Sequence, residues 1–142
     1  MTGGIVYSNP YLKREHSIIS GVVRTLEDVT VSNEGIKPMI DRVSREKQFG
    51  NMTKSMFLDF VLSGIDASSY GLLDCAKDLK ISGKEETAYK IKKEAVTLKS
   101  IILRLVTYLS RNGEDNFENA FALEVGTLRG TRKTLLECLG EI

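Results

Sequence analysis

The chain has 142 residues, of which 42% are hydrophobic and 27% are charged, and its formal net charge is +1. This composition is that of one ordinary globular domain, and it excludes a wholly disordered chain. A net charge so close to zero also excludes a molecule-wide field that would attract DNA, RNA or an anionic membrane.

The two cysteines, Cys75 and Cys138, fall within predicted helices, on or near apolar faces. Thiols in such positions indicate a reducing compartment and not a disulfide framework. The sequence has no run of about 18 apolar residues, and its first residues lack the basic and apolar regions of a leader. We therefore expect a single cytoplasmic domain over 1–142, with a loose lead-in at 1–8 and no membrane partner.

The first predicted helix covers about 9–29. Asn9 is a good N-cap residue, and Pro10 fits the first turn, where its missing N–H group is not needed. After a link, the sequence predicts a short helix over about 38–48.

The second long helix is predicted over about 53–80. It is apolar around most of its circumference, which is typical of a central helix with neighbours on several sides. Ser82 and Glu85 have the spacing of a capping box, so the third helix is expected over about 82–110. Gly113 then supplies a left-handed stop.

Two heptad seams, meaning apolar positions spaced alternately three and four residues apart, mark the last two long helices. Residues at this spacing lie on one face of a helix. The first seam comprises Ala88, Ile91, Ala95, Leu98, Ile102, Leu105 and Leu109, and the second seam comprises Phe117, Phe121, Glu124, Leu128, Thr131, Leu135, Cys138 and Ile142. The turn between them is too short for anything but an antiparallel connection. The predicted fold class is all-α: a four-helix up-down bundle with a short extra helix between the first and second long helices.

His16 is the only histidine in the chain, and it lies on the inward stripe of the first helix. With Glu15 and Ile19 it resembles the E-H-x-x-I start of hemerythrin-like four-helix bundles, whose first helix carries a metal-binding histidine. That family's site requires further histidines on later helices, and this chain has none, so we exclude a di-iron site and expect no cofactor. His16 is then either a ligand or base in the bundle core, or a core-edge histidine bonded to a neighbour.

Glu124 occupies an otherwise apolar seam position between Phe121 and Leu128. An ionised carboxylate alone in a core costs several kcal/mol, so it must be paired, neutral, or facing a cavity or partner. Pairing with His16 across the first and last helices would form a small-ligand or proton-handling site. Otherwise Glu124 lies at the rim of the bundle.

Basic residues gather on the last helix at Arg129, Arg132 and Lys133, and others are spread over 77–104. They allow an interpretation as a small nucleic-acid-associated protein. The basic residues of 77–104 are interleaved with acidic ones, however, which is typical of a solvated helix face. We do not expect nucleic acid to be the partner.

The chain carries no arrangement of nucleophile and base that indicates an enzyme, and we predict no catalytic residues. Apolar residues outside the seams indicate surface that one bundle leaves uncovered. They include Ile101, Val106, Val125 and Leu136. The sequence therefore predicts a non-enzymatic interaction or assembly protein that forms a homodimer. The alternatives are the internal ligand or metal site and the nucleic-acid-associated protein described above.

Overall fold

The computed structural model describes residues 12–30 and 54–142, and this part of the chain is all-α, with five helices and no strand. The helices are α1 (Lys13–Val29), α3 (Lys54–Ile81), α4 (Glu85–Asn112), α5 (Phe117–Ala122) and α6 (Val125–Leu139). The predicted lead-in at 1–8, the predicted helix start at Asn9 and the predicted short helix over 38–48 lie outside the described residues.

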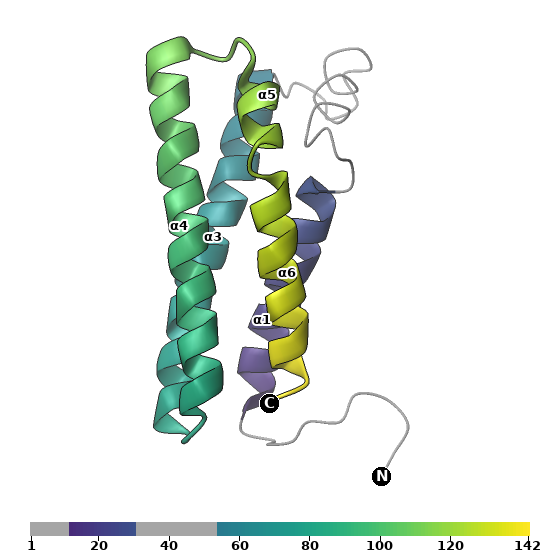
Figure 1. Ribbon diagram of the computed structural model, residues 1–142, viewed down its shortest axis with the longest axis vertical. Helices are drawn as coiled ribbons and strands as arrows, with labels where there is room; N and C mark the ends of the chain where they lie inside the picture. The colour runs from purple at the N-terminus through teal and green to yellow at the C-terminus, as the bar shows by residue number, and fades with distance from the viewer. Residues whose placement is uncertain (1–11, 31–53) are drawn as a thin grey trace.

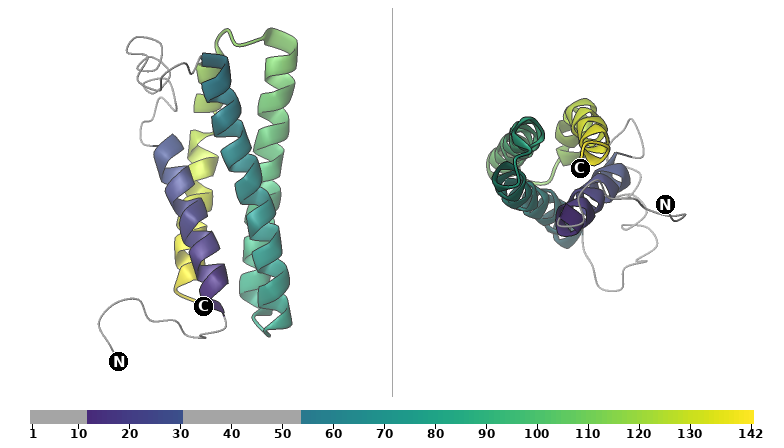
Figure 2. Two further views of the ribbon diagram at one scale, coloured as in Figure 1. Left: turned by 180° about the vertical axis from the view of Figure 1, so that it is seen from behind. Right: turned by 90° about the horizontal axis from the view of Figure 1, so that it is seen from below.

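The helices lie along one long axis and enclose a common core (Figure 1). Seen end-on, α4, α3, α1 and α6 follow one another around that core (Figure 2). In this order each helix packs against the next, and α6 also packs against α4, while α5 contacts α4. The long apolar helix α3 packs against α4 and α1, and several of its large apolar side chains remain exposed, so it is not the enclosed central helix that its composition predicts.

The turn between α3 and α4 differs from the predicted capping box. The N-cap of α4 is Lys84, without a side-chain cap bond, and Ser82 belongs to the end of α3. The Lys84 N–H donates to the Leu79 carbonyl and the Gly83 N–H donates to the Lys80 carbonyl, with Gly83 at φ +85°. This is a Schellman motif, and it uses the residues that the capping box would need. Gly113 does end α4 at φ +67°, as predicted.

The last predicted helix is interrupted. It begins after Asn116, and it divides into α5 and α6 at Leu123 and Glu124. Both of these residues keep right-handed helical dihedrals, and the Glu124 N–H donates to the Phe121 carbonyl three residues back. The interruption is therefore a local tightening of the helix and not a loop.

Both heptad seams form the core as predicted. Every seam residue is buried except Leu109, which is half-buried, and the polar members Glu124 and Thr131 are buried with the rest. Two apolar residues outside the seams, Ile101 and Val125, are also buried, so they do not add to uncovered surface. Val106 and Leu136 are exposed, as expected.

The Thr131 hydroxyl is an exception within this core, because its oxygen is buried and has no hydrogen-bond partner among the residues that the structure describes. We expect Thr131→Val to raise the free energy of unfolding by about 1 kcal/mol, since a similar shape then carries no unsatisfied group. The matched control is Thr87→Val. Thr87 is also buried, but its hydroxyl donates to Glu141 Oε2 at 2.6 Å. We expect Thr87→Val to lower the free energy of unfolding by about 1 kcal/mol. Urea denaturation measures both, and a destabilised Thr131→Val would show that the hydroxyl has a partner in solution.

Candidate functional site

A second heptad stripe runs along α4, one residue after the buried seam. It consists of Tyr89, Lys92, Val96, Lys99, Leu103, Val106 and Ser110. All of these residues are exposed except Lys99, which is half-buried. The helix thus presents one heptad face to the core and a second, partly apolar face to the outside.

The neighbouring helix α3 carries a matching stripe on its outer side. It consists of Met56, Phe60, Ser63, Ala67, Tyr70, Asp74, Lys77 and Ile81, all of them exposed. We call the two stripes together the outer face. Exposed apolar residues scattered singly are normal on soluble proteins, but residues aligned at heptad spacing are typical of helix-packing surfaces.

Lys99 joins the two stripes across the α3–α4 contact. Its ammonium donates to Asp66 Oδ1 at 2.8 Å and to the Tyr70 hydroxyl at 3.0 Å. The same nitrogen lies 4.4 Å from the centre of the Tyr70 ring, within cation–π range. The hydrogen bond that Lys99 donates to Asp66, followed by the one it donates to Tyr70, raises the pKa of Lys99 above its ordinary value. The two stripes therefore form one continuous surface.

Large apolar side chains concentrate on these two helices. Among the described residues eleven such side chains are exposed, and nine of them lie on α3 or α4. The two others are Leu123, between α5 and α6, and Leu136 on α6. The outer face is therefore the main apolar surface of the described part of the chain.

The structure separates the two residues predicted to form a ligand site. His16 is half-buried near the start of α1, with its Nδ1 3.5 Å from the Ser20 hydroxyl. Near the other end of α1, the Thr30 carbonyl accepts from the Arg129 guanidinium in the early part of α6. At a rise of 1.5 Å per residue, Thr30 lies about 21 Å from His16 along the axis of α1. Glu124 precedes Arg129 and lies at that far end, so His16 and Glu124 do not form one site.

Glu124 instead pairs with Arg104 of α4. The guanidinium donates from Nε to Oε2 at 2.7 Å and from Nη2 to Oε1 at 2.9 Å, which is a bidentate arrangement. The Glu124 side chain is 11% exposed, whereas Arg104 is 56% exposed. The hydrogen bond to the carboxylate raises the pKa of Arg104 above its ordinary value. This pair ties the junction of α5 and α6 to α4, and it is structural.

The basic residues proposed to contact nucleic acid do not form an open patch. Arg129 is half-buried and donates to the Thr30 carbonyl from Nε and Nη2, at 3.2 and 2.7 Å. Arg132 is half-buried as well, and of the three only Lys133 is exposed. On α4, Lys90, Lys99 and Arg104 are engaged in ion pairs with acidic residues. This arrangement favours intramolecular roles for most of these cations.

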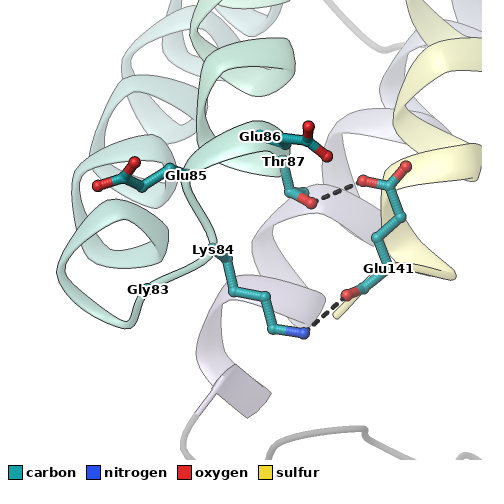
Figure 3. Close-up of a pocket in the computed structure, with 6 residues that line it drawn as sticks. All are labelled: Gly83, Lys84, Glu85, Glu86, Thr87 and Glu141. Carbon is teal, nitrogen blue, oxygen red and sulfur yellow. Dashed lines mark hydrogen bonds between the residues drawn. The ribbon is translucent and has the colours of Figure 1, made fainter.

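The end of the chain is held in a shallow pocket at the start of α4 (Figure 3). Lys84 Nζ donates to the Glu141 carbonyl at 3.0 Å, and Thr87 Oγ1 donates to the Glu141 carboxylate at 2.6 Å. Lys90 Nζ adds a contact of 2.7 Å to the same carboxylate. Lys84 and Thr87, which line this pocket, are therefore used to bind Glu141.

The Glu141 carboxylate makes stability depend on pH. Its hydrogen bonds from Lys90 and then from Thr87 hold its pKa below the ordinary value. A lowered folded-state pKa stabilises the fold above the unfolded-state pKa, and this contribution is lost as the pH falls through the folded-state value. We expect Glu141→Gln to lower the free energy of unfolding by about 0.5 kcal/mol at pH 7, a small value for a partly exposed pair. In acid the free energies of unfolding of the unmodified protein and of Glu141→Gln should become equal. A difference in urea unfolding that stays constant from pH 7 to pH 3 would show that the effect does not come from the charge of Glu141.

Other features of the described residues do not indicate a site. No group of three or more His, Cys, Asp or Glu side chains within 12–30 and 54–142 is placed to hold a metal ion. One helix, Ser55–Ile81, has the length and apolar composition of a membrane span. A core helix meets the same criteria, so one such helix is weak evidence.

The molecule is thus defined by its class: an all-α protein with a buried heptad core and an exposed second heptad face. Comparison with known protein families, with curated proteins and with solved structures finds no match to this chain.

Proposed function

We propose that this protein is a non-enzymatic assembly protein that forms a homodimer through the outer face. The proposal includes a four-helix up-down bundle, in which α5 and α6 together act as the fourth helix. The order of packing around the core, α4, α3, α1 and α6, supports this arrangement.

The observation that carries the proposal is the second, exposed heptad stripe on each of two neighbouring helices. Helix bundles and helical dimers use the same seam packing, so an exposed seam has the pattern of an interface. Tyr70, Val96 and Leu103 are each more than half exposed within it. Burying side chains of this size contributes about 1.5–3 kcal/mol each.

The size of the outer face is sufficient for a stable contact. α3 and α4 each have 28 residues. At 1.5 Å per residue each helix is about 42 Å long, and two neighbouring helices are about 20 Å wide. The face therefore measures about 800 Å², which is the area that each partner contributes to an interface of standard size.

A cytoplasmic location is part of the same proposal. Cys75 and Cys138 are both buried and free. Burial, as the first cause, raises the pKa of Cys75 to about 12 and that of Cys138 to about 11. Such thiols stay protonated and unreactive, which suits a protein that does not depend on disulfides.

Light scattering over a concentration series tests the proposal. We expect the weight-average mass to rise from that of one chain to that of two chains across the micromolar range. Binding of an apolar dye should fall in parallel, because the dimer covers the outer face. A mass of one chain at every concentration, without dye binding, would contradict the proposed function.

A further inference from the structure

The two halves of the outer face differ in charge. Asp74 on the α3 stripe and Lys92 on the α4 stripe are both exposed, and neither forms an ion pair or hydrogen bond with any residue that the structure describes. Asp59 adds a second exposed acid on α3, and Lys93 adds a second exposed base on α4. Charges of the other sign are also exposed, with Lys77 on α3 and Glu85 and Glu86 at the start of α4, so the difference between the two halves rests on Asp74 and Lys92.

The contacts of Lys99 fix which residues of the two stripes lie at the same height. Lys99 bonds to both Asp66 and Tyr70, so it lies level with the turn between them. Moving toward the α3–α4 turn, Asp74 is about 9 Å and Lys92 about 10 Å from that level, at 1.5 Å per residue. Asp74 and Lys92 are therefore at nearly the same height on neighbouring helices.

The shapes of the stripes also match at equal height. Leu103 lies four residues beyond Lys99, at the height of Ser63 and Ala67 on α3. Ser63 and Ala67 are small and exposed, whereas Leu103 is 59% exposed and projects. A large side chain on one stripe thus faces small side chains on the other, which is the condition for interdigitated helix packing.

We infer that the occupant of the outer face is a second copy of this chain, packed with its α3 against α4 of the first copy about a two-fold axis parallel to the helices. The inference rests on the proposed function and deepens it. A rotation about this axis leaves the height of each residue along the helices unchanged. It brings the α3 stripe of one copy opposite the α4 stripe of the other. It places Asp74 opposite Lys92 of the partner subunit, and Leu103 opposite Ser63 of the partner subunit. Because the interface is isologous, each contact occurs twice.

Charge favours this arrangement over the two alternatives in which like helices meet. Packing α3 on α3 about a parallel axis would oppose Asp74 and Lys77 to their own copies. Packing α4 on α4 would oppose Lys92 and Lys93 to their own copies. Like charges placed directly opposite one another weaken an interface and select against that partner geometry.

Charge reversal tests the arrangement. At low salt, Asp74→Lys and Lys92→Glu should each weaken self-association about tenfold, because each places two like-charge contacts in the dimer. When the two single variants are mixed, the dissociation constant of the mixed dimer should return to within about twofold of that of the unmodified protein, because both contacts then join opposite charges. Sedimentation equilibrium of each variant and of the mixture provides the dissociation constants, and circular dichroism checks that each variant folds.

The outcomes separate the two proposals. If the unmodified chain dimerises but neither reversal weakens it, the arrangement is wrong and self-association stands. If the double variant Asp74→Lys/Lys92→Glu recovers affinity but the mixture does not, the two residues interact within one chain, and the arrangement is again wrong. If the unmodified chain stays a monomer, the proposed function itself fails.

Discussion

Replacing Leu103 by glutamate is expected to raise the dimer dissociation constant by at least about 100-fold. Leu103 is more than half exposed in the single chain, so the substitution leaves the core unchanged. In the dimer it removes about 1.5–3 kcal/mol of apolar burial and places a carboxylate in an apolar contact. Sedimentation equilibrium measures the change.

Leu123→Glu is the matched control for this substitution. Leu123 is even more exposed, at 84%, but it lies between α5 and α6 and outside the outer face. The same change in chemistry should therefore leave the dissociation constant within about twofold of that of the unmodified protein. If Leu103→Glu and Leu123→Glu weaken the dimer equally, the interface does not lie on the outer face.

The second large effect concerns the pair that fixes the junction of α5 and α6. We expect Arg104→Ala to lower the free energy of unfolding by about 2 kcal/mol, because it leaves the buried Glu124 carboxylate without its bidentate partner. The exposure of Arg104 keeps the effect below that of a fully buried pair. Urea denaturation measures the loss.

The double variant Arg104→Ala/Glu124→Leu identifies the cause. Replacing the carboxylate by an apolar side chain of similar volume removes the unpaired charge, so most of the stability should return. If the double variant has a lower free energy of unfolding than Arg104→Ala alone, the loss comes from packing of the arginine stem and not from the unpaired carboxylate.

The buried core was predictable from the sequence because a heptad spacing alone fixes which helix face is apolar. This is why both seams are buried down to their polar members Glu124 and Thr131. Helix ends were less predictable, because Ser82 fits two capping motifs and only the left-handed Gly83 decides between them. Likewise, Glu124 at the α5–α6 junction pairs with an arginine twenty residues earlier, and a contact between two helices cannot be read from the spacing within one of them.

The outer face has a signal in the sequence besides the two buried seams. Tyr89, Val96 and Leu103 are seven residues apart, one position after the buried seam. Lys92 and Lys99 lie between them and give the stripe the appearance of an ordinary solvated face. Two other apolar residues outside the seams, Ile101 and Val125, are buried, so only the structure distinguishes core from surface among them.

Native mass spectrometry of the protein from gentle buffer is a direct test of self-association by the bare chain. We expect a species with the mass of two chains and no additional bound mass. A single chain at micromolar concentration would contradict self-association. A chain that retains an extra mass would contradict the assignment as a bare assembly protein, and the size of that mass would distinguish a metal ion from an organic ligand.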